Sequence, residues 1–230
     1  MNRRNFSKLA VMSGLIGLAP SKLFSTLKKD HHLKISLAQW SLHKAIKSGK
    51  LSGLDFAKKS RSFGIDGIEY VSGLYTTHSN LLEKMSMDKL SDELLKRSNN
   101  YGIDNVLIMI DGQGNLASSN KKERMLAIDN HKRWIDFAAK LGCKTLRLNL
   151  NGDMNLEKWT DNSVKSLTTL SNYNDNINVV VENHGGFSSS GKYLANVMSN
   201  VDLKNCGTLP DFGNFCMTGS PRGACAKWYD

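Results

Sequence analysis

Short apolar runs alternate with amphipathic stretches from residue 33 onward, and this alternation constrains the fold most. The apolar runs have the length of buried strands, and the amphipathic stretches have the period of helices. Several of the expected helices end at a glycine, which is a common helix terminator. Strands that alternate with helices in this way form parallel sheets covered by helices. The sequence therefore predicts an α/β protein built from parallel strand–helix units.

Six such units follow from the pattern. A closed (β/α)8 TIM barrel needs eight units, so we expect a barrel that is truncated after about six and occupies residues 33–230 as one domain. An open doubly wound sheet is the alternative, but no glycine-rich nucleotide loop follows the first strand. The expected strands are residues 34–39, 65–70, 103–110, 144–149, 177–182 and 206–211, and the expected helices are residues 51–63, 87–101, 121–141, 156–173 and 190–199, with a last one from residue 224.

The longest expected helix covers residues 121–141 and shows the clearest pattern. Its apolar face contains Ile128, Trp134 and Ile135, and Gly142 follows its last residue. Such a stripe usually packs against a sheet. We expect His131 of this helix to lie at the surface.

The first 30 residues have the composition of an export signal. A basic start from Asn2 to Lys8 contains the pair Arg3 and Arg4, and an apolar stretch from Leu9 to Pro20 follows it. That order is typical of a secretory signal, and the stretch is too short for a stable membrane span. The paired arginines favour a twin-arginine signal over an ordinary one. We therefore predict an exported, periplasmic protein.

Much of the net charge lies in the same segment, which argues against one class of function. The chain has 31 Lys and Arg against 21 Asp and Glu, a formal net charge of +10. Residues 1–29 hold six of these basic residues and no acidic one, so the remainder carries only +4. Nucleic-acid binding usually needs a strongly basic face. We therefore expect no nucleic-acid partner.

Polar side chains follow nearly every expected strand, at the end where barrels of this kind carry their active sites. Many donors and acceptors on one rim suit a hydroxylated small molecule, and we expect a carbohydrate ligand. A second copy of the chain is a possible further partner. The candidate residues are Gln39, Trp40 and His43 after the first strand, Glu69 at the second, Asp111 after the third, Asn149 after the fourth, Glu182 and His184 after the fifth, and Asp211 and Asn214 after the sixth.

Glu182 and Asp211 are the strongest candidates, because each follows an apolar run that soon breaks at glycine. In a barrel, these two strand ends face the same small volume. Two carboxylates that face each other repel, so a cation or a shared proton is needed to keep them together. We favour a divalent metal. The alternative for each residue is a helix cap or a surface ion pair.

Three segments resemble a known family. They read Ser-Leu-Ala-Gln-Trp-Ser-Leu-His at residues 36–43, Val-Glu-Asn-His-Gly-Gly at 181–186 and Leu-Pro-Asp-Phe-Gly-Asn-Phe at 209–215. They are similar to the sugar phosphate isomerase/epimerase family, which has a xylose-isomerase-like barrel. The resemblance implies a divalent metal (Mn, Mg, Co or Zn) held by Glu, Asp, His and Glu of the last four strands. Glu182 matches the first of these ligands and Asp211 the second.

The resemblance also implies a reaction. Family members move a proton from the carbon next to a carbonyl group, and Glu182 matches the residue that is both ligand and acid/base. We therefore predict a metal-dependent isomerase or epimerase of a carbohydrate. The alternatives are a lyase or hydrolase that acts on keto-sugars with the same site, and a carbohydrate-binding barrel without catalysis.

For the remaining candidates, the sequence leaves two interpretations each. Glu69 and Asp111 either contact the ligand or cap the helices that follow them. Trp40 either stacks on a sugar face or lies in the core, and His43 either contacts a hydroxyl group or lies in an exposed loop. His184 either contacts the substrate or orients Glu182.

Overall fold

The structure is a computed structural model that describes residues 34–76 and 81–214. The expected export signal at residues 1–30 lies outside these ranges, as does the helix expected from residue 224. Within them, no helix is both long and apolar enough for a membrane span.

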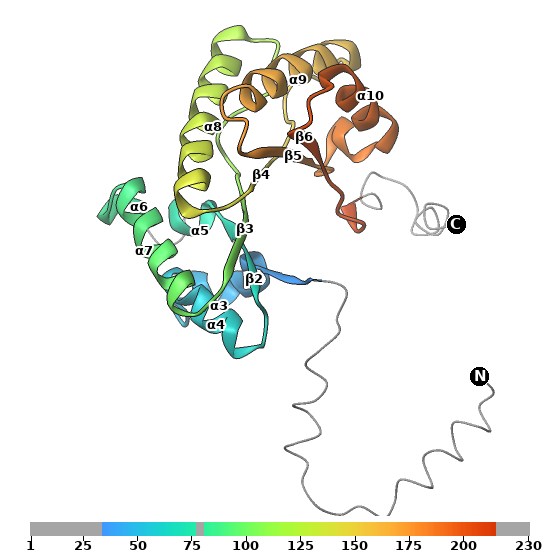
Figure 1. Cartoon of the computed structure of the whole chain (residues 1–230). Coiled ribbons are helices and arrows are strands. Elements are labelled where there is room, and N and C mark those ends of the chain that lie inside the picture. Colours follow the sequence, from blue (N-terminus) through green and yellow to red (C-terminus); the bar gives the residue numbers. More distant parts are fainter. Residues whose placement is uncertain (1–33, 77–80, 215–230) are drawn as a thin grey trace, which may run out of the picture. The chain divides into compact units, whose positions relative to one another are not determined.

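The described strands form one parallel sheet in the order of the chain, as expected (Figure 1). Each strand pairs in parallel with the next, so every connection is a crossover. The strand ends differ from the expected ones by at most two residues. The strands are β1 (Ser36–Ala38), β2 (Gly67–Val71), β3 (Asp104–Met109), β4 (Thr145–Leu148), β5 (Asn178–Glu182) and β6 (Cys206–Leu209).

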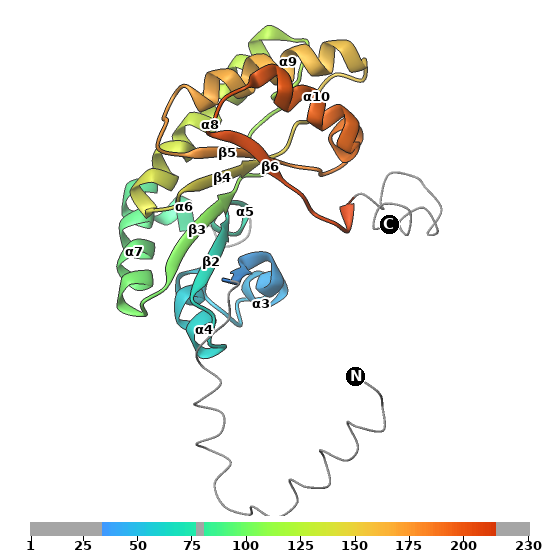
Figure 2. The same ribbon diagram turned by 45° about the vertical axis from the view of Figure 1, so that its right-hand side comes forward.

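Five long connecting helices cover the sheet on one of its faces, as Figure 2 shows for α7 to α10. The α/β architecture is therefore confirmed. The helix expected at residues 51–63 is divided into a 3-10 turn, η2 (Gly53–Asp55), and the helix α4. The helices are α4 (Phe56–Ser62), α7 (Met87–Asn100), α8 (Lys121–Leu141), α9 (Leu156–Ser171) and α10 (Gly191–Val201).

Several short helical turns lie after the strand ends, and the sequence pattern did not predict them. Each is four or five residues long, too short for a hydrophobic period of 3.6 residues to be recognised. They place side chains around the carboxyl ends of the strands. They are η1 (Gln39–Leu42), α3 (His43–Lys47), α5 (Gly73–Thr76), α6 (Leu81–Lys84) and η3 (Gly186–Ser189).

The two faces of the sheet carry different side chains, because successive residues of a strand point to opposite faces. On the helix-covered face, Ile68 and Tyr70 of β2 and Leu146 of β4 are fully buried in the main core. On the opposite face, Val71 of β2 and Met109 of β3 belong to a second, smaller apolar cluster. Strand positions of this second face therefore point toward the inside of the curved sheet.

Backbone hydrogen bonds join the loop after β3 to the loop after β4. The Ala117 N–H donates to the Asn151 carbonyl at 2.9 Å, and the Asp153 N–H donates to the Ala117 carbonyl at 3.1 Å. Ala117 and Gly152 form an isolated parallel bridge between these bonds. The two loops are thus held together beside the carboxyl ends of the strands.

His131 of α8 is buried, with 3% of its surface exposed, so the expectation of a surface histidine is wrong. Its Nδ1 lies 2.7 Å from the Ala127 carbonyl oxygen one turn earlier. Helix α8 packs against α7 on one side and α9 on the other as well as on the sheet. A helix with three neighbours buries more of its circumference than the apolar stripe alone indicates.

Burial lowers the pKa of His131, and the hydrogen bond to Ala127 opposes this shift only in part. Protonation therefore favours the unfolded chain. We expect the neutral, buried ring to contribute fully to the free energy of unfolding above about pH 6.5, the pKa of histidine in the unfolded chain. This contribution is lost as the pH falls further. Urea denaturation at pH 7.5 and 5.5 measures the effect.

In the variant His131→Leu, the free energy of unfolding should fall much less between pH 7.5 and 5.5 than it does in the wild type. The control Ile135→Val, at a fully buried position of the same helix, should lower the stability but keep the wild-type pH dependence. An unchanged pH dependence in His131→Leu would show that other groups cause it.

Candidate functional site

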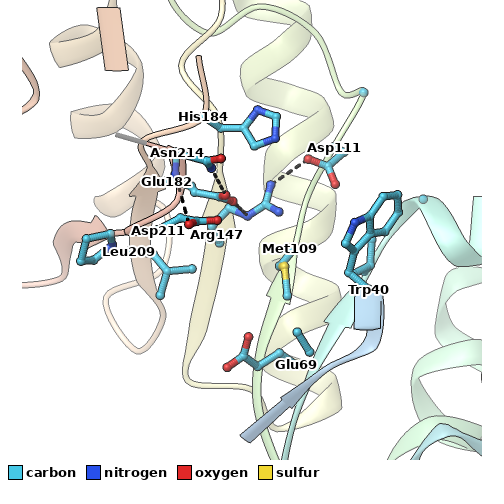
Figure 3. Close-up of a pocket in the computed structure, with 15 residues that line it drawn as sticks. Trp40, Glu69, Met109, Asp111, Arg147, Glu182, His184, Leu209, Asp211 and Asn214 are labelled. Carbon is cyan, nitrogen blue, oxygen red and sulfur yellow. Dashed lines mark hydrogen bonds and ion pairs between the residues drawn. The ribbon is translucent and has the colours of Figure 1, made fainter. Parts of the chain in front are cut away.

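A cavity of about 770 Å³ lies at the carboxyl ends of the strands, on the concave side of the sheet (Figure 3). Residues at the ends of all six strands contribute to its wall. The wall includes four carboxylates, Glu69, Asp111, Glu182 and Asp211. Among the described residues that line it, Arg147 is the one Lys or Arg side chain.

Arg147 on β4 joins two of these carboxylates. Its Nη1 lies 2.7 Å from Asp111 Oδ1, and its Nε lies 2.8 Å from Glu182 Oε2. Only 7% of its side chain is exposed. The guanidinium bridges the ends of β3 and β5 because β4 lies between them in the sheet. Arg147 is thus the central positive charge of the cavity.

The contact between Arg147 and Glu182 is an ion pair without a directed hydrogen bond. The two atoms are close, but among the described residues the Nε–H has no acceptor with hydrogen-bond geometry. At 2.8 Å the opposite charges still attract each other, and this attraction offsets part of the cost of burying them. The guanidinium is therefore near Glu182 without being held there by an aligned bond.

Glu182 ends β5 and is buried, with 10% of its side chain exposed. Its Oε1 accepts a hydrogen bond from Asn214 Nδ2 at 2.9 Å, and its Oε2 faces Arg147. A buried carboxylate without such partners would be costly. Both oxygens of Glu182 are therefore stabilised by polar groups of neighbouring strand ends.

Asn183 fixes Asp211 next to this carboxylate. Its Nδ2 donates to the Asp211 carbonyl at 2.8 Å, and its Oδ1 accepts from the Asp211 N–H at 2.7 Å. The side chain of Asp211 in turn accepts from the N–H groups of Gly213 and Asn214. The ends of β5 and β6 thus form one hydrogen-bonded unit that contains both predicted metal ligands.

The described residues fit a divalent metal only in part. Glu182 and Asp211 offer carboxylate oxygens, which hard divalent cations prefer. However, residues 34–76 and 81–214 contain no group of three or more His, Cys, Asp or Glu side chains that could hold a metal. The two carboxylates therefore suit a metal as two of its ligands and do not make a complete site.

The structure brings most of the predicted site residues together and leaves three of them outside the cavity wall. His184 is exposed at its edge. Gln39, His43 and Asn149 are absent from the described lining. The predicted site residues that do line the cavity are Trp40, Glu69, Asp111, Glu182, His184, Asp211 and Asn214.

Gln39 is fully buried, and its side chain has partners within the protein. Its Nε2 donates to the Tyr75 hydroxyl at 2.7 Å, and its Oε1 accepts from the Val71 N–H at 3.0 Å. Gln39 therefore ties the end of β1 to β2 and α5. These bonds give the Gln39 amide a structural role, and its contact with substrate stays a prediction.

Trp40 and His43 form a stacked pair at the rim. Their ring centroids are 4.4 Å apart with planes tilted by 10°, and Lys47 Nζ lies 4.7 Å from the Trp40 ring centroid. Trp40 is 48% exposed, so it is not a core residue. His43 supports the indole ring and does not line the cavity.

Glu69, Asp111 and Asn149 also have partners that the sequence did not show. Glu69 accepts a hydrogen bond from the Ser36 hydroxyl on the neighbouring strand. Asn149 Nδ2 donates to Asp111 Oδ1 at 3.0 Å, the same oxygen that faces Arg147. Asp111 does not cap α8, whose N-cap is Asn120.

Arg147 was not predicted as a site residue. One signal in the sequence points to it, because it is a charged residue within the apolar run of β4. It precedes Asn149 by two positions and so shares its face of the strand. A charge at an inward position of a buried strand needs a partner there.

The comparisons agree with the resemblance in the sequence. The family model described as xylose isomerase-like TIM barrel matches residues 57–227. No curated protein matches the chain.

Solved structures match at low identity. The IOLI protein with a bound zinc atom is 17% identical, with a TM-score of 0.63, over 82% of this chain and 66% of that one. D-psicose 3-epimerase with D-fructose is 15% identical, with a TM-score of 0.64, over 85% and 69%. A xylose isomerase-like TIM barrel protein from Mycobacterium smegmatis with magnesium is 15% identical, with a TM-score of 0.60, over 86% and 71%. The chain thus spans about two thirds of their length, and identities this low show the fold alone.

Proposed function

We propose, from the premise that the chain belongs to the xylose isomerase-like TIM barrel family, that it is an isomerase or epimerase of a carbohydrate. The observation that carries the proposal is Glu182, a buried carboxylate at the inner end of β5 that faces a cavity of about 770 Å³. D-psicose 3-epimerase and 3-keto-D-glucoside 4-epimerase are among the proteins with a similar fold.

The proposed reaction is proton transfer at the carbon next to a carbonyl group. Such a step needs a base within reach of the C–H bond and stabilisation of the negative charge that forms on the oxygen. Glu182 is the proposed base. Asn214 positions its carboxylate by a hydrogen bond, and the Arg147 guanidinium pairs with it.

A divalent metal (Mn, Mg, Co or Zn) is part of the proposal, and Glu182 and Asp211 would hold it. Bound there, it would polarise the substrate carbonyl. Two of the similar structures contain zinc or magnesium. The further ligands are not among the described residues.

The charge of the cavity favours an uncharged sugar over a sugar phosphate. Its described wall has four carboxylates and one guanidinium, so a phosphorylated substrate would meet a negative surface. Trp40 offers the exposed part of its ring to a sugar face, while His43 and Lys47 support the indole. We also propose that residues 1–30 export the barrel domain to the periplasm, where free sugars are the more available substrates.

Deuterium exchange tests the proposal. The full chain is incubated with uncharged ketoses in D2O, with and without Mn²⁺, and NMR follows the C–H signals next to the carbonyl group. We expect loss of one of these signals and the appearance of the epimeric or isomeric sugar, and no comparable rate with the ketose phosphates. Sugar binding without any exchange would contradict an enzymatic function and favour a binding protein.

A further inference from the structure

We propose that Arg147 is a second catalytic residue of the proposed isomerase or epimerase. Its guanidinium donates a hydrogen bond to the substrate carbonyl oxygen, on which negative charge forms while Glu182 takes the proton. The inference rests on the proton transfer of the proposed function, and the groups that it needs from the protein are all among the described residues.

One edge of the Arg147 guanidinium can accept a ligand. Nη1 donates to Asp111 Oδ1 at 2.7 Å, but the Nε–H has no aligned acceptor, and Nη2 has no hydrogen-bond partner among the described residues. The side chain belongs to the cavity wall, and Figure 3 shows the guanidinium pointing into the cavity. Nε and Nη2 lie on the same edge of the planar group. A ligand oxygen at Nη2 would therefore complete the hydrogen bonds of this guanidinium.

This edge lies next to the proposed base, as the reaction requires. The proton that leaves and the carbonyl oxygen are on adjacent carbons of the substrate, so the base and the donor must lie side by side. Arg147 on β4 pairs with Val180 on β5, and Glu182 follows two positions later on the same face of the sheet. Arg147 Nε consequently lies 2.8 Å from Glu182 Oε2.

The proposed step moves negative charge from one side of the guanidinium to the other. Glu182 takes the proton, the electrons of the C–H bond form a C=C bond, and the electrons of the carbonyl double bond move to the oxygen to give an enolate. Arg147 loses one anionic neighbour and gains another. A donor fixed in this way stabilises the enolate more than the neutral carbonyl group. Protonation of carbon then restores the carbonyl group.

Asp111 holds the guanidinium in this orientation. Its Oδ1 accepts one hydrogen bond from Arg147 Nη1 and another from Asn149 Nδ2 at 3.0 Å. Only 7% of the Arg147 side chain is exposed, so solvent weakens these interactions little. Asp111 is therefore a positioning residue, and the guanidinium need not reorganise when the enolate forms.

Chemical rescue of C–H exchange in D2O tests the role of Arg147 in the full chain. Arg147→Ala should lower kcat for exchange about 100-fold or more, as the loss of an oxyanion donor does in other enzymes. Guanidinium ions at millimolar concentration, far below the concentrations that unfold proteins, should restore part of the rate. Urea has a similar shape without the charge and should restore none. A merely structural role of Arg147 would give no such difference.

Arg97 on α7 provides a matched control, because it also joins two carboxylates. Its Nε lies 2.7 Å from Glu93 Oε1 and its Nη1 lies 2.7 Å from Asp55 Oδ1, and it does not line the cavity. Arg97→Ala should lower the stability, keep the exchange rate and show no effect of added guanidinium. Thermal unfolding of each variant separates a loss of stability from a loss of rate.

Arg147→Lys gives a second test if Arg147→Ala does not fold. It keeps a positive charge beside Glu182 and Asp111, which protects the fold. A single ammonium group cannot hold Asp111 and the substrate oxygen in the geometry of a guanidinium, so we expect kcat to fall about tenfold or more. KM should stay within a few fold of the wild type, because the lost interaction forms mainly in the transition state.

The outcomes separate the two proposals. If the wild type exchanges the C–H and a folded Arg147→Ala is equally fast, or is restored no better by guanidinium than by urea, the role of Arg147 is wrong and the proposed proton transfer stands. A folded Arg147→Lys with the kcat of the wild type would also overturn this role. If the wild type exchanges no C–H, the proposed function and the role of Arg147 are both wrong.

Discussion

The variant Gly152→Ala is expected to lose about 3 kcal/mol or more of its free energy of unfolding, because it forces two backbones apart. A Cβ atom at Gly152 would lie 2.2 Å from the carbonyl carbon of Ala117 and 2.5 Å from its oxygen. Backbone atoms cannot move aside as the end of a flexible side chain does. The parallel bridge between Ala117 and Gly152 would therefore break.

This bridge holds together the loops that follow β3 and β4. Asp111 and Asn149 begin these two loops, so we expect the variant to disturb the pairing of Arg147 as well. Urea denaturation measures the loss of stability. The matched control is Gly191→Ala at the start of α10, where a Cβ would meet no atom within 4 Å. The control should change the free energy of unfolding by less than about 0.5 kcal/mol. A Gly152→Ala variant as stable as the wild type would contradict the predicted clash with the Ala117 backbone.

The elements of the fold were predictable where local signals mark both ends. Helix α8 begins and ends where the sequence predicts, because the Asn120 side chain caps its first turn and Gly142 adopts the left-handed conformation after its last residue. Strand ends are less certain, since the last pairing residue depends on the neighbouring strand. The one-turn helices α5 and α6 carry no period and could not be predicted.

The candidate site was predictable as a place and less so as a set of partners. Parallel topology alone brings Glu182, Asp211 and Asp111 to one cavity. It does not show that Arg147 on β4 neutralises two of these carboxylates, because this pairing depends on the register of three strands. Gln39 has the same sequence signal as the true lining residues, yet its amide is used to join β1 to β2. A polar residue after a strand is thus either a ligand contact or a structural tie.

The burial of His131 has a similar cause. The sequence of one helix shows its apolar stripe, but it does not show which neighbouring helices cover its sides. Helix α8 lies between α7 and α9, so a polar ring next to the stripe becomes buried as well.

The variant Glu182→Gln is expected to lower the rate of substrate C–H exchange about 100-fold or more. An amide cannot take the proton, while its shape and its hydrogen bond with Asn214 are largely kept. Removing one partner of a buried ion pair also leaves Arg147 less well neutralised, which costs stability. Thermal unfolding of the variant must therefore be measured beside the exchange rate in D2O.

Two further variants assign the loss to the base. Glu182→Asp keeps the charge near Arg147 and so protects the fold, but it withdraws the carboxylate by one methylene, and we expect a clear loss of exchange with little loss of stability. Glu69→Gln changes the same residue type on β2, where the carboxylate contacts Ser36 and lies apart from the Glu182 cluster (Figure 3). It should retain most of the exchange rate. If Glu69→Gln abolished exchange and a folded Glu182→Gln retained it, the catalytic base would lie on β2, and the role proposed for the end of β5 would be wrong.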